Sequence, residues 1–502
     1  MSIRSRWVLV LLGLCGLLAL PQVQADEPVD VVSALEAKVA DAIARVQPSI
    51  VAITRIAGDN GETTAIKGRN PLPPNAPADD VEPMLMPNGL ARQVRPGFPN
   101  EAAPEYFALP GDFGGGVVIG DQGEILTTYH LLKGAARIRV RAKGATFDAE
   151  IIAADPRTDL AVIVPRAGAT MPAKLVPIPL GDATKLRQGS FLIALGNPYN
   201  SARDGQASAS LGILSNIARR LDPPQGEVIN LNIRQFFKYQ STLMQLDSRL
   251  NLGMSGGAVV NLKGELVGIT TSESSPSGYD AAAGYAIPLD PLGRKAVGAL
   301  MQGKEVEYGF IGIGLNQSQN NTVSEVKKNT PAWKANLATN DRILAVGNMT
   351  LADDEGALQM ALASVPVGES VKLRVLHEGK EVERSLIMSK YPVMGGAIST
   401  NRPTAWRGLR IDFTSVLTGG LNTNDTLEAM TRGGVGVIEV EPQSVAAKAG
   451  VNKGDVILSV NGQDISTPAE FRAAVKKSDG GETKLILASD SPNGKEVVVP
   501  GS

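Results

Sequence analysis

The stretch NLGMSGGAVVNLKGELVGI, residues 251–269, carries the most information about the fold. Two short apolar runs, one from Ala258 and one from Leu266, are separated by a turn around Gly264. Runs of this length, bounded by turn residues, predict β-strands. Ser255 lies in a glycine turn just before the first run, in a pattern that fits G-x-S-x-G. This turn predicts either a serine nucleophile or an ordinary serine in a flexible loop.

Short apolar runs separated by turns continue from Gly114 to about Pro288. No convincing helical pattern interrupts them, and the 54 glycines of the chain favour many turns. Many short strands with regular turns predict a β-barrel or a β-sandwich. The protein is therefore expected to be mainly β in this region, with a domain over residues 111–300.

Length and charge limit the classes of function. A chain of 502 residues is too long for one hydrophobic core and predicts two to four domains. Lys and Arg number 49 and Asp and Glu 51, so no overall basic field attracts nucleic acid. We expect no nucleic-acid partner.

The first 25 residues predict an export signal. A basic start is followed by 14 apolar residues, from Trp7 to Leu20, and by small residues ending at Ala25. This is the layout of a cleaved signal peptide, and the apolar run is too short to span a bilayer. The only cysteine, Cys15, lies in that run, so we expect no disulfides and no thiolate metal sites in the mature chain. Because the run is short and is removed with the signal, we also expect no stable membrane span. An exported protein without disulfides fits the periplasm or cell envelope of a bacterium.

Residues 26–56 predict a helix and then a strand that must pair with later strands. Pro48 ends the helix, whose apolar face is formed by Val32, Leu35, Val39, Ile43 and Val46. Residues 57–110 are rich in proline and lack periodicity, so a long mobile loop inserted in the β-rich domain is expected there.

An internal repeat occupies the last third of the chain. KANLATNDRILAVGN from Lys334 aligns without gaps to KAGVNKGDVILSVNG from Lys448. Each copy is followed by a helix-like stretch and then by strands. The repeat predicts two small α+β domains, at residues 305–392 and 403–500.

Only two histidines are present, and histidine is the commonest general base for activating a hydroxyl. His377 is expected to be a solvent-facing residue of a hairpin. His130 ends a β-like run in the β-rich domain. Asp159 directly precedes an apolar strand, where an imidazole N–H is a suitable partner for its carboxylate. The order His130, Asp159, Ser255 therefore predicts a catalytic triad in the order of chymotrypsin.

Two alternatives compete with this assignment. Asp155 is a second carboxylate, but it precedes Pro156 and is expected to be a turn residue. The nucleophile elbow of α/β-hydrolases also fits G-x-S-x-G, but it needs a helix after the serine and a later histidine. The segment after Ser255 is strand-like. In the preferred interpretation, Gly253 and Ser255 supply backbone N–H groups to an oxyanion hole.

The motifs ILTTYHLLKGA, DPRTDLAVIV, GNPYN and NLGMSGGAVVNLKGELVGI jointly resemble the HtrA (DegP-like) trypsin-fold serine proteases. This resemblance implies a trypsin-like double β-barrel followed by two PDZ domains. It also implies that His130 is the base, Asp159 its orienting acid and Ser255 the nucleophile. The chain departs from the family at Thr128-Tyr129 and at Met254, where the family usually has asparagine.

PDZ domains bind peptide C-termini as an added strand, with the carboxylate held by a hydrophobic-Gly loop. In the first repeat, Phe310, Ile311 and Gly312 are the candidate donors. In the second, Arg410 is expected to replace the glycine. For both repeats, the alternative to a binding role is that of an interdomain spacer.

The sequence as a whole predicts an exported, ATP-independent serine endopeptidase without metal or cofactor. It would cleave unfolded or damaged envelope proteins and bind C-terminal peptides at the first PDZ domain. The family resemblance implies a homotrimer or a higher oligomer. The alternative is a catalytically inactive PDZ scaffold or holdase.

Overall fold

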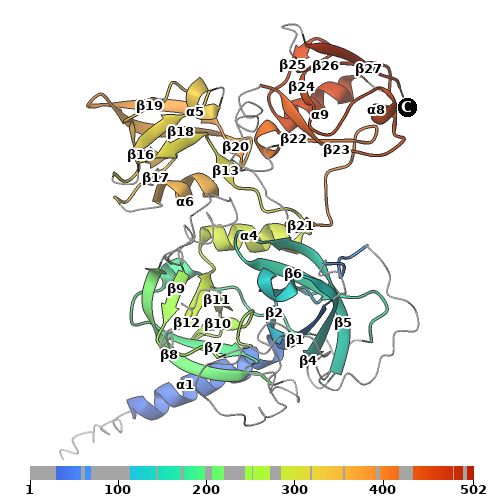
Figure 1. Cartoon of the computed structure of the whole chain (residues 1–502). Helices are drawn as coiled ribbons and strands as arrows, with labels where there is room; N and C mark the ends of the chain where they lie inside the picture. Colours follow the sequence, from blue (N-terminus) through green and yellow to red (C-terminus); the bar gives the residue numbers. More distant parts are fainter. Residues whose placement is uncertain are drawn as a thin grey trace, which may run out of the picture.

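The fold was obtained from a computed structural model, and the chain folds mainly into β-strands (Figure 1). The structure describes residues 30–57, 63–68, 113–142, 145–170, 175–197, 206–219, 243–251, 253–271, 284–316, 319–328, 330–353, 357–391, 396–417, 433–478, 480–489 and 494–501. The predicted signal peptide and most of the Pro-rich stretch lie outside these residues. Among the helices that are described, none is long and apolar enough to cross a membrane.

Two β-barrels lie side by side in the first part of the chain. The first has the strand order β5-β4-β1-β2-β3-β6 and is closed by pairing between β5 and β6. The second closes in the order β10-β11-β12-β9-β8-β7. Their strands are β1 (Ile50–Ala57), β2 (Phe113–Val118), β3 (Ile125–Thr128), β4 (Ala135–Ala142), β5 (Ala145–Asp155), β6 (Leu160–Pro165), β7 (Phe191–Gly196), β8 (Ser208–Arg219), β9 (Leu243–Leu246), β10 (Ala258–Asn261), β11 (Leu266–Thr271) and β12 (Gly284–Pro288).

The early strand β1 pairs with β2 and β4, as predicted from its need for later partners. Within the Pro-rich stretch, however, residues 63–68 do not belong to a mobile loop. Ala65 and Ile66 are buried, and Ile151 in β5 exchanges hydrogen bonds of 2.8 and 3.0 Å with Ala65 and Lys67. Their apolar side chains explain this packing against the first barrel.

Two longer helices pack against the barrels, α1 (Val31–Val46) and α4 (Pro291–Met301). Only the C-terminal end of α1 is buried, at Ala42 and Val46, whereas Val32 is 74% exposed. One hydrophobic core joins this end of α1 to both barrels and to α4.

The first repeat folds as a separate sheet-and-helix domain over the barrels. A four-stranded sheet of order β17-β16-β18-β19 packs against α6, beside the short pairs β13–β20 and β14–β15. Its elements are β13 (Gly309–Phe310), β14 (Ile313–Leu315), β15 (Val323–Val326), α5 (Pro331–Lys334), β16 (Arg342–Val346), β17 (Met349–Thr350), α6 (Ala357–Ser364), β18 (Ser370–His377), β19 (Lys380–Ile387) and β20 (Ser389–Lys390).

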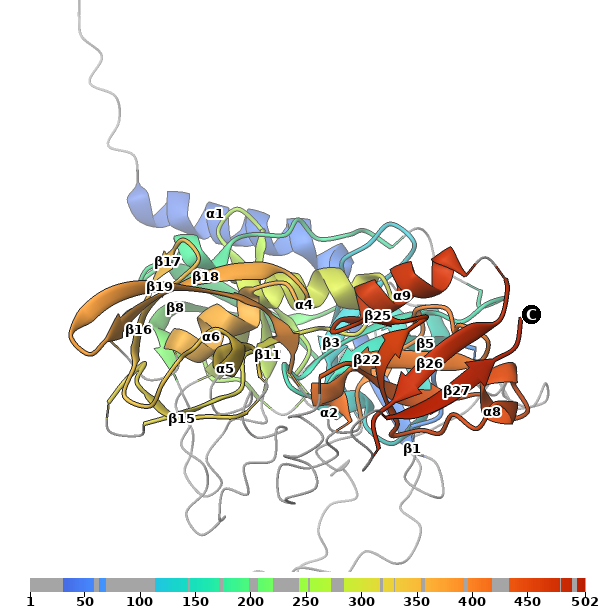
Figure 2. The same cartoon turned by 90° about the horizontal axis from the view of Figure 1, so that it is seen from above.

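The second repeat has the order of helices and strands found from β14 to β19 of the first, and Figure 2, which is seen from above, shows the two domains side by side. A sheet of order β22-β23-β24-β26-β27, with β25 paired to β24, packs against α9. Its elements are β22 (Leu409–Phe413), β23 (Val435–Val440), α8 (Val445–Lys448), β24 (Val456–Val460), β25 (Gln463–Asp464), α9 (Pro468–Lys477), β26 (Thr483–Leu487) and β27 (Lys495–Val499).

A buried lysine joins the two repeat domains. The Nζ atom of Lys390, whose side chain is 3% exposed, lies 2.9 Å from Glu305 and 2.6 Å from Asp412 in β22. Burial opposes the charge on Lys390, but the carboxylates of Glu305, Asp412 and Glu307 raise its pKa. The lysine is therefore held in its charged form at this junction.

Candidate active site

His130 and Asp159 form a side-chain pair at one end of the first barrel. His130 lies in the short helix α2 (Tyr129–Leu132), directly after β3, and Asp159 directly precedes β6. Because Thr128 in β3 pairs with Leu160 in β6, the residues beyond this pair lie next to each other. His130 Nδ1 lies 2.7 Å from Asp159 Oδ2, and the backbone N–H of His130 donates to Oδ1 at 2.8 Å. Both oxygens of the carboxylate are thus directed at His130.

The Asp159 carboxylate is fixed from both barrels. Asp159 has a φ of 58°, a left-handed conformation that aspartate tolerates better than most residues. Its carbonyl accepts a hydrogen bond from the Tyr129 N–H at 2.9 Å. The hydroxyl of Thr271, at the end of β11 in the second barrel, donates to Oδ2 at 3.3 Å. With its side chain 15% exposed, Asp159 lies at the strand entrance where it was expected.

Ser255 lies in the turn between β9 and β10 of the second barrel and is 5% exposed. Its carbonyl accepts a hydrogen bond of 2.7 Å from the Gly115 N–H in β2 of the first barrel. The next two residues of the turn, Gly256 and Gly257, form hydrogen bonds of 2.9 and 3.0 Å with the backbone of Thr270 in β11. The serine turn is therefore held by strands from both barrels.

Two chains of contacts bring this turn to the His130–Asp159 pair. In the first, the Gly115 carbonyl accepts a hydrogen bond of 2.8 Å from Thr127 Oγ1, three residues before His130. In the second, Thr270 pairs with the turn while its neighbour Thr271 contacts Asp159. The structure thus brings all three predicted residues to the boundary between the barrels.

The glycines of the serine turn are required by close backbone contacts. Gly253 has a φ of 87°, and a Cβ placed on it would lie 2.5 Å from both the Asn197 carbonyl and the Phe113 ring. Gly256 has a φ of 81°, and its Cβ would lie 2.2 Å from the Gly115 carbonyl. Since no real Cβ occurs so close to other atoms, a side chain at either position would displace the turn.

Met254 occupies a packing position. The residue is 4% exposed, and its sulfur lies against Gly196 in β7. Its carbonyl accepts hydrogen bonds from the Gly257 N–H, at 3.0 Å, and from Thr270 Oγ1. The C=O and N–H of one trans peptide point in opposite directions, so the Ser255 N–H is directed away from Thr270. Met254 is therefore a buried residue packed against β7, and its backbone carbonyl helps to fix the turn.

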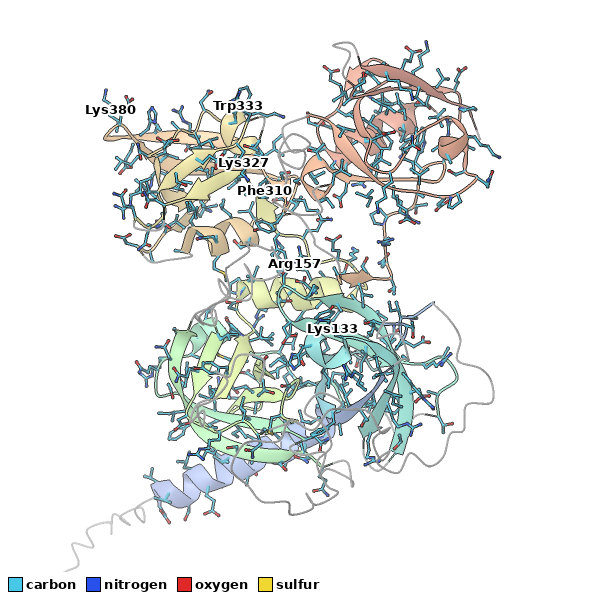
Figure 3. The ribbon with its side chains drawn as sticks, in the orientation of Figure 1. Lys133, Arg157, Phe310, Lys327, Trp333 and Lys380 are labelled. Carbon is cyan, nitrogen blue, oxygen red and sulfur yellow. The ribbon has the colours of Figure 1, made fainter. Side chains whose placement is uncertain are left out.

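Asp155, the competing carboxylate, belongs to another cluster. It is the last residue of β5 and is 1% exposed, so the expectation that it is a turn residue is wrong. Its carboxylate accepts hydrogen bonds from Arg157 Nε, at 2.7 Å, and from the Tyr308 hydroxyl, at 2.6 Å. Burial raises the pKa of Tyr308, which keeps this hydroxyl protonated. Figure 3 shows Arg157 at the top of the barrels, on the side that faces the first repeat domain.

His377 forms a second His–Asp pair, far along the chain in the first repeat domain. It ends β18 at a hairpin, as expected, but it does not simply face solvent. Its Nδ1 lies 2.6 Å from Oδ1 of Asp341, whose side chain is 2% exposed. No local sequence pattern indicates this pair, because the two residues are 36 positions apart.

The candidate carboxylate loop of the first repeat is well fixed. Ile311 is 1% exposed, and its carbonyl accepts a hydrogen bond of 2.9 Å from the Ala332 N–H. The N–H of Gly312, in the same peptide plane, points the opposite way. Gly312 has a φ of 82° and packs against Thr330, and the rings of Phe310 and Tyr391 meet edge to face. Phe310 is labelled in Figure 3.

The second repeat has the same loop two positions before the place where its glycine was expected. Gly408, with a φ of 84°, packs against Ser444 as Gly312 packs against Thr330. The Ala446 N–H donates to the Arg407 carbonyl at 3.2 Å, as Ala332 does to Ile311. The prediction that Arg410 replaces the glycine is therefore wrong. The departure is instead Arg407, whose guanidinium donates to the carbonyls of the C-terminal residues Val499 and Pro500 and of Gly481.

Sequence reasoning missed Thr271 as a partner of Asp159. The two residues are 112 positions apart and meet only because the barrels dock. Among the described residues, no group of three or more His, Cys, Asp or Glu side chains is placed to hold a metal ion.

Comparison with known proteins agrees with this architecture. Residues 114–269 match the trypsin-like peptidase domain, and residues 309–387 and 436–488 each match a PDZ domain. A probable periplasmic serine endoprotease DegP-like from Brucella melitensis is 30% identical over 490 residues, which cover 92% of this chain and 88% of the relative. The periplasmic serine endoprotease DegP of Salmonella typhimurium is 29% identical over 373 residues, 72% of this chain and 70% of the relative. The chain therefore belongs to the family of HtrA/DegP-like periplasmic serine endoproteases, with a trypsin-like peptidase domain and two PDZ domains.

Proposed function

We propose that His130, Asp159 and Ser255 are the catalytic triad of this serine endoprotease. The observation that carries the proposal is the convergence of the His130–Asp159 pair and the Ser255 turn at the boundary between the barrels. With the Nδ1 proton facing Asp159, His130 Nε2 is left as the base.

In the proposed reaction, Ser255 Oγ attacks the scissile carbonyl while His130 Nε2 takes the hydroxyl proton. The C–N bond then breaks, and His130 returns this proton to the leaving amine. Water hydrolyses the resulting acyl-enzyme by the same route. The negative charge on Asp159 stabilises the imidazolium, and the N–H groups of Gly253 and Ser255 stabilise the oxyanion.

The substrates we propose are unfolded or damaged proteins of the periplasm or cell envelope, reached after removal of residues 1–25 as a signal peptide. Extended, unfolded chains suit a protease that acts without an energy source. We further propose that Phe310, Ile311 and Gly312 bind the C-termini of peptides, since the Gly312 N–H points away from Ala332, whose N–H donates to the Ile311 carbonyl. The active form is proposed to be a homotrimer or a higher oligomer.

Substitution of the nucleophile tests the triad. Ser255→Ala is expected to lower kcat on unfolded casein by about 10⁶-fold and to abolish labelling by a fluorophosphonate. The matched control is Ser459→Ala, at a buried serine of the second PDZ domain. This variant should keep the wild-type kcat on casein and should be labelled at the wild-type rate. Casein cleavage by Ser255→Ala at the wild-type rate would refute the triad, and absence of labelling in the wild type would favour the inactive scaffold.

A further inference from the structure

The segment between the two PDZ domains returns to the first barrel. Residues Ile398 and Ser399 form the strand β21, which pairs antiparallel with Ala154 and Ala153 at the end of β5. The N–H and the hydroxyl of Thr400 both donate to the Ile152 carbonyl, at 3.1 and 2.8 Å. Figure 1 shows β21 between the barrels and the domains above them. The segment therefore covers an edge of the barrel sheet that would otherwise be unpaired at these residues.

The rest of this segment, residues 396–401, is also anchored. The Asn401 N–H donates to the Gly303 carbonyl at 2.9 Å, and its side-chain amide donates to the Gln302 carbonyl at 3.0 Å. Ile398 packs against the hydrophobic core of the first barrel. These contacts make residues 396–401 part of the protease domain's surface rather than a free spacer.

At its start, the segment touches the residue that precedes His130. A Cβ placed on Gly396 would lie 2.7 Å from the hydroxyl oxygen of Tyr129 and 3.9 Å from Cγ of Pro156. Gly396 has a φ of 85°, so both its backbone and its close approach favour glycine.

Tyr129 and the end of β5 are both close in the chain to the His130–Asp159 pair. The Tyr129 N–H donates to the Asp159 carbonyl at 2.9 Å, and His130 is the next residue. β21 pairs with Ala153 and Ala154, next to Asp155, the last residue of β5, after which the turn that presents Asp159 begins. Residues 396–401 thus contact both chain segments that carry the pair.

We propose that residues 396–401 are a positioning element of the active site, which holds Tyr129 and the turn before Asp159 so that His130 is correctly placed. The inference rests on the proposed triad. Catalysis is sensitive to such placement, because a displacement of about 1 Å can cost about 10²-fold in rate. Detachment of the segment is therefore expected to lower kcat and leave KM unchanged.

The contact between Gly396 and Tyr129 is tested by a double-mutant cycle. Gly396→Ala places a methyl group against the Tyr129 hydroxyl and is expected to lower the rate of fluorophosphonate labelling by about 10-fold. In the double variant with Tyr129→Phe, which removes that hydroxyl, labelling should recover to within about 3-fold of Tyr129→Phe alone. Gly450→Ala is the matched control, since Gly450 has a φ of 86° and nothing lies within 4 Å of its Cβ position.

A second variant tests the strand itself. Thr400→Pro removes both donors to the Ile152 carbonyl, and we expect a similar fall in labelling and kcat that Tyr129→Phe does not rescue. Thermal unfolding of each variant checks that the barrels remain folded. The proposal is overturned if Gly396→Ala and Thr400→Pro both label at the wild-type rate, or if Gly450→Ala slows labelling as much as Gly396→Ala. Failure of the triad itself is distinguishable, because the wild type would then not label at Ser255.

Discussion

The two His–Asp pairs of this protein have nearly the same geometry and different surroundings. His130 Nδ1 lies 2.7 Å from Asp159 and His377 Nδ1 lies 2.6 Å from Asp341. The histidine side chains are 24% and 30% exposed. A His–Asp contact of this length is therefore not sufficient evidence for a general base.

The difference lies in what else the structure brings to each pair. Asp159 receives the backbone N–H of His130 and the hydroxyl of Thr271, and the turn of Ser255 is bonded to the neighbouring strands. Asp341 instead accepts the Ala338 N–H at 2.9 Å, three residues earlier in its own loop. The first carboxylate joins two barrels, whereas the second closes a local turn.

The internal repeat supports a structural role for Asp341. The matching residue in the second PDZ domain, Asp455, accepts the Asn452 N–H at 2.8 Å in the same way. The turn is thus part of the PDZ fold, and His377 is an addition to it in the first domain.

The largest difference between the two pairs is expected in kcat when each histidine is replaced by alanine. His130→Ala is expected to lower kcat on casein by about 10⁶-fold, because the base is lost. His377→Ala should leave kcat within about 2-fold of wild type and lower only the stability of the first PDZ domain. A large loss of kcat in His377→Ala, with the domain still folded, would remove the distinction between the two pairs.

A smaller effect should distinguish the two repeat aspartates. Asp341→Ala removes the acceptor of two hydrogen bonds and should lower the free energy of unfolding of its domain by about 2–3 kcal/mol. Asp455→Ala removes the turn bond at a less buried position and should cost about 1 kcal/mol. Calorimetry on the full chain measures both. Equal losses would mean that the bond to His377 adds nothing to stability.

The smallest effect is expected at the contact between the protease domain and the first PDZ domain. Burial lowers the pKa of Lys295 to about 8, and its Nζ lies 2.9 Å from the Ala363 carbonyl in α6. Above pH 8 the folded state therefore binds fewer protons at this lysine than the unfolded state, so its contribution to stability rises with pH up to its unfolded pKa.

Because Lys295 is partly exposed, this rise should be about 1 kcal/mol or less between pH 8 and pH 9.5. Urea unfolding of wild type and Lys295→Met across that range measures it. The same pH dependence in both proteins would show that Lys295 is not its source.

The sequence predicted those features that depend on neighbouring residues. The strand runs, the glycine turn at Ser255, the repeat from Lys334 and Lys448, and the position of Asp159 before a strand are all local patterns. The chemistry of histidine and serine, with their order along the chain, was enough to nominate the triad.

Features made by distant residues were not predictable in this way. The burial of Asp155 against Arg157 and Tyr308, the partnership of His377 with Asp341, and the glycine at 408 rather than 410 all emerged from the structure. A short loop can be aligned in more than one register, and only its backbone contacts fix which residue must be glycine.

The sequence by itself therefore determined the elements of this protein, its order of domains and the residues from which a triad can be built. Only the tertiary structure decided which carboxylate faces His130, which threonine supports it and where residues 396–401 lie. The physical reason is the range of the interactions. Periodicity and turn preference act over a few residues, whereas the Thr271–Asp159 bond, across 112 residues, forms only after the barrels close and dock.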